Sequence, residues 1–162
     1  NIENIKNIYS FDFLVGSIHF IDGWAFSHKK QPWRKENYNL NCLYKRYYEL
    51  MYELVESNLF SGLAHPNSLQ CFGAYPIGDY DTEYSRIARA LKENNMYIEE
   101  SSGLATNYGD TELGMNGKML KAMILQDVQI LTASDAHIPQ NVGNLICEMN
   151  DLIAKEKKEY GR

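Results

Sequence analysis

Short β-rich apolar runs alternate with amphipathic helical segments along the whole chain, and this order is the feature that most restricts the fold. The strand candidates are short apolar runs, and they cover residues 11–20, 60–65, 96–101 and 130–134. The helical candidates repeat apolar residues every three or four positions, and they cover residues 40–58, 82–94, 117–126 and 142–158. Consecutive strands joined by helices must run in the same direction, so the sequence predicts an α/β fold with a parallel sheet.

Polar residues mark the starts of two predicted helices. Thr82 and Asn116 are predicted N-caps, because their side-chain oxygens can accept a hydrogen bond from a free main-chain N–H of the first turn. The helix predicted for residues 142–158 ends in basic residues, which suit the negative pole of a helix C-terminus. No internal repeat, low-complexity tract or interdomain linker interrupts the pattern, so we expect residues 1–162 to form a single domain.

The charge balance argues against nucleic-acid binding. The chain has 21 acidic and 16 basic residues and a formal net charge of -5, whereas phosphate backbones attract clustered Lys and Arg.

No apolar run approaches the roughly 20 residues that cross a bilayer, so no membrane association is expected. Cys42, Cys71 and Cys147 show no CxxC spacing, and they predict neither a disulfide framework nor a zinc knuckle. We therefore expect a cytoplasmic protein.

Side chains with metal-binding chemistry lie at the ends of the predicted strands. His19 and His65 lie at the ends of the first two strands, and Asp135 and His137 follow the fourth. The carboxyl ends of parallel strands meet at one edge of the sheet, so these four side chains are expected to converge. Imidazole and carboxylate groups suit zinc, iron or manganese. Taken alone, each histidine is as well explained by a hydrogen bond to the main chain, and the convergence favours a metal site.

The spacing within the strand-end segments gives further detail. Asp135 and His137 are two residues apart, so in extended backbone both side chains point to the same face and could meet one ion or bridge two. Glu99 and Glu100 end the third predicted strand and are secondary candidates for contact with a metal or with a metal ligand. The alternative for both is a partly solvated strand end.

Four short motifs follow the predicted strands in order: Gly16–Phe20 with Asp22, Gly23, Trp24 and Phe26; Leu63–Pro66; Glu99–Leu104; and Ser134–His137 with Val142 and Gly143. Together they resemble the PHP-domain family of metal-dependent phosphoesterases, of the histidinol-phosphatase type. A single tetrapeptide of this kind is weak evidence, and four in the family's order make coincidence improbable.

The resemblance implies a distorted (β/α)7 TIM-like barrel, of which this chain would form about the C-terminal four βα units. It also implies up to three divalent ions, zinc, iron or manganese, and hydrolysis of a small phosphorylated metabolite of histidine biosynthesis by a metal-activated water. On this basis His19, His65, Asp135 and His137 are expected metal ligands, and Asp135 and His137 are expected to be catalytic.

The chain lacks part of the family's pattern. An N-terminal His-x-His motif, a further histidine and a metal-bridging glutamate precede the segment that resembles Gly16–His19, and this sequence has no counterpart to them. A (β/α) barrel needs about 250 residues, so an N-terminal segment of about 90 is expected to be missing. Without it, a sheet edge and apolar helix faces would be uncovered, which predicts association with the missing segment or self-association.

Two further positions depart from the family and leave the substrate open. Asn67 stands where the family has an Asp after His-Pro, and Ala105 stands where many members have a basic residue after Ser-Gly-Leu. Lys118, at the start of the helix capped by Asn116, is the candidate phosphate-binding residue in its place, because the positive pole of a helix favours phosphate.

Two alternatives to hydrolysis follow from these departures. The chain could be a non-catalytic PHP remnant that binds a metal or a phosphorylated ligand, which the missing N-terminal motif would favour. A PHP nuclease is a weaker alternative, because it needs a basic groove along a nucleic-acid strand and this chain is acidic.

Overall fold

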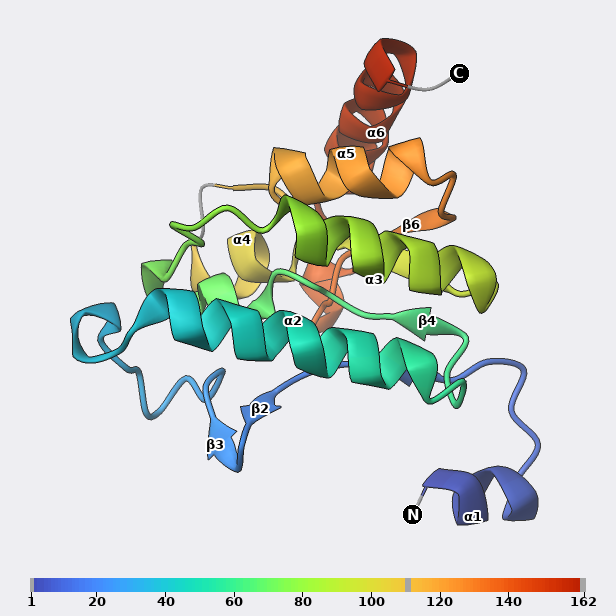
Figure 1. Ribbon diagram of the computed structural model, residues 1–162, viewed down its shortest axis with the longest axis horizontal. Helices are drawn as coiled ribbons and strands as arrows, with labels where there is room; N and C mark the ends of the chain where they lie inside the picture. The colour runs from blue at the N-terminus through green and yellow to red at the C-terminus, as the bar shows by residue number, and fades with distance from the viewer. Residues whose placement is uncertain (1, 110–111, 161–162) are drawn as a thin grey trace.

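A parallel four-stranded sheet forms the centre of the protein in a computed structural model that describes residues 2–109 and 112–160 (Figure 1). The strand order is β1-β4-β5-β6, with all three pairs parallel. The strands are β1 (Val15–Gly16), β4 (Gly62–Leu63), β5 (Tyr97–Ser101) and β6 (Ile130–Ala133). The four strands therefore lie side by side in the order in which they occur along the chain.

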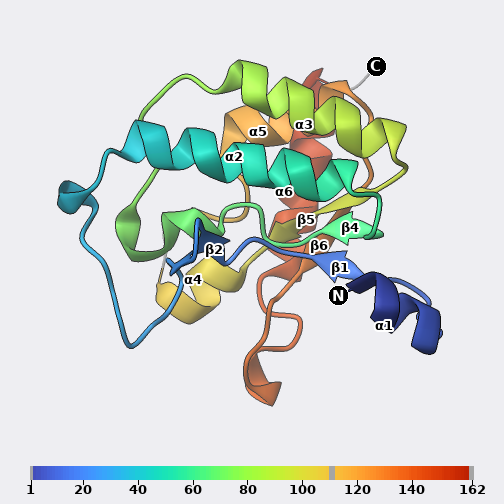
Figure 2. The same cartoon turned by 60° about the horizontal axis from the view of Figure 1, so that its bottom comes forward.

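The connecting helices form one row on one face of this sheet (Figure 2). They are α2 (Leu40–Glu56), α3 (Asp81–Glu93), α5 (Gly117–Leu125) and α6 (Ile146–Tyr160). Contacts join α2 to α3, α3 to α5, and α5 to α6. Right-handed crossovers between strands that advance in one direction place every helix on the same face. The predicted α/β class with a parallel sheet is confirmed.

Strand pairing determines which side chains face the helices. Leu63 pairs with Ile98, and both are fully buried under the helices. Val15 and Leu131 are 37% and 41% exposed, so the opposite face is only partly covered. Residues adjacent on a strand point to opposite faces, so Glu99 and Glu100 of β5 point away from each other. This alternation decides which of them can reach the strand-end site.

Tyrosines fill much of the core between α2 and α3. The buried face of α2 carries Tyr44, Tyr47, Tyr48, Met51 and Val55, which recur at helical spacing. The hydroxyl groups of Tyr48 and Tyr84 lie 3.0 Å apart, so these buried rings satisfy each other across the helix pair. Packing is thus the role of these tyrosines, as their spacing predicts. Within the described chain, no helix is both long and apolar enough to span a bilayer.

The sequence predictions missed several short elements. These are α1 (Ile2–Ile8), the antiparallel hairpin of β2 (Phe20–Ile21) and β3 (Trp24–Ala25), α4 (Gly103–Tyr108), and three 3-10 turns at Lys35–Asn37, Ser68–Gly73 and Pro139–Asn141. Asp22 and Gly23 have φ values of 48° and 86° at the hairpin turn. Asp-Gly is a strong signal for such a turn, so the hairpin could have been predicted.

Three predicted boundaries were wrong. The strand predicted for residues 60–65 is paired only at β4, Gly62–Leu63. The strand predicted for residues 11–20 is paired only at Val15–Gly16, because β4 offers just two residues as a partner. The last helix begins at Ile146, since Gly143 and Leu145 adopt left-handed backbone that a helix cannot contain. Thr82 was also wrong as an N-cap, because α3 begins one residue before it. The Asn116 cap is confirmed: its side chain accepts a hydrogen bond from the N–H of Met119 at 3.1 Å.

Candidate functional site

Candidate ligands from three strand ends line one small cavity. Its volume is about 100 Å³, and its lining consists of His19, Ser27, His65, Ser68, Leu104, Tyr108, Asp135 and His137. The segments after β1, β4 and β6 supply the histidines and the aspartate. The structure therefore brings together all four residues that the strand-end argument selected.

Hydrogen bonds to Ser68 and Glu99 hold His65 in place. The Ser68 hydroxyl lies 2.8 Å from the carbonyl oxygen of His65 and 2.5 Å from Nδ1 of its ring. When the hydroxyl donates to that carbonyl oxygen, it accepts from Nδ1–H of the ring. The neutral ring then presents an unprotonated Nε2, which is the form that binds a metal. The main-chain N–H of His65 donates to Oε2 of Glu99 at 3.1 Å.

His19 has a similar serine partner. Its Nδ1 lies 2.9 Å from the Ser27 hydroxyl, and its ring centroid lies 5.0 Å from that of His65 at a tilt of 54°. Hydrogen bonds of this kind to the second ring nitrogen orient histidine ligands and fix their tautomer. The two imidazoles thus approach each other from neighbouring strand ends.

Asp135 and His137 complete the ring of candidate donors. Nε2 of His137 lies 3.7 Å from Oδ1 of Asp135, which is an electrostatic contact beyond hydrogen-bond length. The carbonyl oxygen of Asp135 accepts from the side-chain amide of Asn107 at 2.9 Å. A side chain at Gly103 would overlap the Asp135 carboxylate, so the glycine allows α4 to lie directly against it.

The backbone at one of the candidate ligands is strained. His65 has a φ value of 29°, in the left-handed region that side chains other than Gly, Asn and Asp rarely adopt. Asp135 has a φ of 45°, which an aspartate adopts more readily. Strained conformations persist where surrounding contacts hold them and cluster at functional sites, so the one at His65 supports a functional role for this edge of the sheet.

The electrostatics of the cavity favour neutral imidazoles. Burial lowers the pKa of His19 and of His65, and the nearby Asp135 carboxylate opposes this in both. Burial also raises the pKa of Glu99, the His65 N–H opposes that change, and the Asp135 charge adds to it. Neutral histidines and an aspartate are the donors that a borderline divalent cation requires.

The types of donor group in the cavity suit a metal ion, but too few of them are arranged to hold one. The Nε2 atom of His65, the second imidazole of His19 and the Asp135 carboxylate are all suitable ligands. Over residues 2–109 and 112–160, however, no group of three or more His, Cys, Asp or Glu side chains is arranged to hold one ion. A metal here would need additional ligands or a closer approach of these side chains.

The secondary candidates lie on different sides of β5. Glu99 faces the cavity side and supports His65 through its main-chain N–H. Glu100 is fully buried, and its Oε2 accepts from the N–H of Met115 at 3.0 Å. Asn67 donates to the carbonyl oxygen of Gly114 at 2.7 Å. None of Glu99, Glu100 and Asn67 is among the residues that line the cavity.

Lys118 lies outside the cavity. Its Nζ is 3.4 Å from Oδ1 of Asp79 and 3.2 Å from Oδ1 of Asp81, and its side chain is 61% exposed. These carboxylates already neutralise its charge and would have to be displaced by a phosphate. Its role in phosphate binding stays a prediction, and the structure gives it no contact with the four candidate ligands.

Sequence reasoning missed Ser27, Ser68 and Tyr108. The two serines orient the imidazoles, and the Tyr108 hydroxyl donates to the carbonyl oxygen of Ser27 at 2.6 Å. Ser68 is three residues after His65, a spacing typical of a side-chain-to-main-chain turn, so it had a weak sequence signal. Tyr108 had none, because its contact with Ser27 spans 81 positions of the chain.

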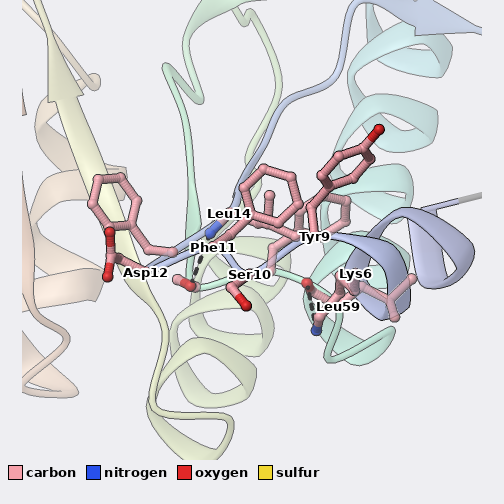
Figure 3. Close-up of a pocket in the computed structure, with 10 residues that line it drawn as sticks. Lys6, Tyr9, Ser10, Phe11, Asp12, Leu14 and Leu59 are labelled. Carbon is pink, nitrogen blue, oxygen red and sulfur yellow. Dashed lines mark hydrogen bonds between the residues drawn. The ribbon is translucent and has the colours of Figure 1, made fainter.

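A larger hollow of about 400 Å³ lies at the amino ends of β1 and β4 (Figure 3). Residues of the first segment, including Tyr9 and Phe11, form one wall, and residues 59–61 before β4 form the other. Lys6 donates to the carbonyl oxygen of Leu59 at 3.2 Å across it. The hollow contains no histidine or cysteine among its lining residues, so we assign it no catalytic chemistry.

Comparison with known proteins gives one informative similarity. The chain is 24% identical over 149 residues to the probable histidinol-phosphatase of Deinococcus radiodurans, which covers 88% of this chain and 54% of that protein. The similarity is to a probable phosphatase. No family model matches the chain. The chain spans about half the length of this relative, and the identity supports a distant, histidinol-phosphatase-like relationship.

Proposed function

We propose that this chain is part of a metal-dependent phosphatase of the PHP type, which hydrolyses a small phosphomonoester such as histidinol phosphate. In this proposal the four strands form part of a distorted (β/α)7 barrel in the cytoplasm, and further polypeptide supplies the other strands and ligands. The similarity to a probable histidinol-phosphatase over half of its length supports this proposal.

The convergence of His19, His65, Asp135 and His137 on one cavity is the observation that carries the proposal. These residues come from three strand ends that are far apart in the sequence, and ordinary packing gives no reason to place four such side chains together. The orientation of both imidazoles by serines and the strained backbone at His65 support it.

Each residue has a defined task in this proposal. His19, His65, Asp135 and His137 would hold divalent ions, which when bound supply an activated water and neutralise phosphoryl charge. Ser68 and Ser27 keep the two imidazoles oriented. Glu99 holds the main chain of His65 in place. Leu104 gives the cavity an apolar wall that limits access of bulk water.

A metal- or phosphate-binding remnant without turnover is the second candidate. It is favoured by the finding that no three of the described His, Cys, Asp or Glu side chains are arranged to hold an ion. Both candidates predict that the same cavity binds a metal or a phosphate group. Only the phosphatase predicts hydrolysis of a phosphomonoester.

The test is metal content together with hydrolysis in the intact protein. Wild type should retain divalent metal after dialysis, measured by mass spectrometry of the elements, and should hydrolyse p-nitrophenyl phosphate and histidinol phosphate. The double variant Asp135→Ala, His137→Ala should lose both metal and at least about 100-fold in activity. His28→Ala is the matched control, because His28 is exposed and does not line the cavity.

The outcomes discriminate clearly between the candidates. Metal lost together with activity in the double variant, and retained in His28→Ala, would support the phosphatase. Metal bound at the cavity without turnover of any phosphomonoester would favour the remnant. A folded wild type that holds no metal and hydrolyses nothing would overturn the proposed activity.

A further inference from the structure

The ammonium group of Lys29 lies over an aromatic ring that lines the candidate site. Nζ of Lys29 is 4.9 Å from the ring centroid of Tyr108, within the range of a cation–π contact. Tyr108 shares the cavity lining with His19, His65 and Asp135. Tyr108 therefore contacts both this cation and the cavity that the candidate ligands line.

Several contacts fix the segment that carries Lys29. The Tyr108 hydroxyl donates to the carbonyl oxygen of Ser27 at 2.6 Å, and the Ser27 hydroxyl contacts the ring of His19 at 2.9 Å. Phe72 packs edge-on against Tyr108, with centroids 5.5 Å apart. Lys29 follows Ser27 by two residues, so its main chain is tied to α4 and to the cavity rather than to a free loop.

The charge of Lys29 is available for a ligand. In the described part of the chain it forms no ion pair with a carboxylate, whereas the following cations each do: Arg46, Arg86, Lys92 and Lys118. No Lys or Arg is among the residues that line the cavity. Lys29 therefore supplies a protein cation beside the cavity, which can bind an entering phosphate group together with any metal held there.

From this geometry we propose that Lys29 binds the phosphate group of the substrate at the mouth of the cavity, with Tyr108 as its platform. The inference rests on the proposed phosphatase function and adds to it a residue that binds the phosphate group of the substrate. A single cation attracts a dianionic phosphomonoester about twice as strongly as a monoanionic phosphodiester at the same distance. Lys29 would thus favour terminal phosphates over internal phosphate links.

The test compares Lys29→Met with Lys30→Met in the intact protein. Methionine keeps much of the apolar stem and removes the charge, and Lys30 is an exposed neighbour for which the structure gives no ring contact. For Lys29→Met we expect KM for p-nitrophenyl phosphate to rise about tenfold, with kcat within about twofold. Lys30→Met should resemble wild type, and Lys29→Arg should recover most of the affinity.

Inorganic phosphate gives a readout that does not depend on turnover. Its Kd, measured by isothermal titration calorimetry at low ionic strength, should rise by a similar factor in Lys29→Met and should approach the variant's value in wild type as salt is added. Tyr108→Leu should weaken phosphate binding in the same direction, because it removes the platform. Thermal unfolding of each variant shows that the fold is retained.

The failure of this inference differs from the failure of the proposed function. Hydrolysis with equal KM and equal phosphate affinity in Lys29→Met and Lys30→Met would overturn the role of Lys29 and leave the phosphatase standing. If phosphate binding depends on Lys29 but the protein hydrolyses no phosphomonoester, the phosphate-binding role of Lys29 is supported and the proposed phosphatase activity is contradicted. An equal fall in activity toward p-nitrophenyl phosphate and bis(p-nitrophenyl) phosphate would contradict the preference for monoesters.

Discussion

The carboxylate of Glu99 accepts a hydrogen bond from the main-chain N–H of His65 at 3.1 Å, and it thereby joins the carboxyl end of β5 to that of β4. The bond holds His65 where its backbone φ is 29°, a value that the chain would otherwise leave. Glu99 thus positions a candidate ligand through its main chain and does not need to touch a metal itself.

Replacing Glu99 tests this role. Glu99→Ala removes the acceptor from a partly buried N–H and should lower the free energy of unfolding by about 1–2 kcal/mol, measured in urea. Glu99→Gln keeps an acceptor oxygen and should lose less than half as much. Glu93→Ala is the control, because Glu93 is an exposed carboxylate on α3. Equal losses in Glu99→Ala and Glu99→Gln would show that the hydrogen bond does not hold His65.

The strongly periodic parts of the fold could be predicted from the sequence. Residues 40–58 place apolar side chains every three or four positions, and α2 covers all but the last two of them. The candidate site was predictable for a related reason, since polar residues that follow buried strands meet at one edge of a parallel sheet. Local pattern was sufficient in both cases.

The remaining parts depend on long-range contacts. The apolar run at residues 11–20 reads as one strand, yet Phe11 and Phe13 are exposed because β4 pairs with two residues only. Glu99 and Glu100 looked equivalent until the register of β5 placed them on opposite faces. Tyr108 reaches Ser27 through folding alone, and no local pattern marks it.

Glu100 should make stability depend on pH. Burial raises its pKa from 4.5 to about 8, and the N–H of Met115 opposes this shift. Between these two pH values the unfolded chain gives up the proton and the folded chain keeps it, so stability falls as pH rises, by about 1.4 kcal/mol per pH unit from this group. Above about pH 8 both states are ionised and the loss from this group stops.

The local hydrogen bonding explains why the neutral form suits this site. Oε1 of Glu100 is a buried oxygen that has no hydrogen-bond partner within the described residues. A buried carboxylate in this position lacks a donor for its second oxygen, whereas protonation removes the charge. Urea unfolding at pH 6 and pH 8 should therefore show a smaller loss of stability in Glu100→Gln than in wild type, by about 2 kcal/mol. Parallel pH profiles for the two proteins would argue against a neutral Glu100.

Gly114 should tolerate no side chain, because it lies against Glu100. Its φ is 74°, and a Cβ at this position would overlap Oε1 of Glu100. Gly114→Ala combines a left-handed backbone cost of about 1–2 kcal/mol with about 1–3 kcal/mol of overpacking. Gly109→Ala is the matched control: its φ is 71°, and a Cβ there would meet no atom of the described residues within 4 Å.

The difference between the two glycine variants isolates the packing against Glu100. Both should lower the midpoint of urea unfolding, and Gly114→Ala should lose at least about 1 kcal/mol more than Gly109→Ala. Adding Glu100→Ala to Gly114→Ala should recover part of this extra loss, since it removes the group that the methyl would meet. If Gly114→Ala and Gly109→Ala lower stability equally, only the backbone cost is at work, and the proposed tight contact with Glu100 is contradicted.

The aromatic hollow at the amino ends of β1 and β4 predicts self-association of the 162-residue chain. Ile8, Tyr9 and Phe13 are 70%, 62% and 63% exposed, and they precede the edge strand β1 in the chain. Tyr9 lines the hollow (Figure 3). Exposed apolar patches next to an open strand edge favour pairing with another chain. Sedimentation velocity should therefore show wild type moving from monomer to dimer as its concentration rises.

Substitutions at the hollow distinguish specific dimerisation from non-specific hydrophobic association. The double variant Tyr9→Ser, Phe13→Ser removes apolar surface that a second copy would cover, so it should remain monomeric at concentrations where wild type is a dimer. Ile77→Ser removes a side chain that is 75% exposed but does not line the hollow, and it should dimerise as wild type does. If wild type stays monomeric at every concentration, these exposed aromatic side chains do not mediate self-association.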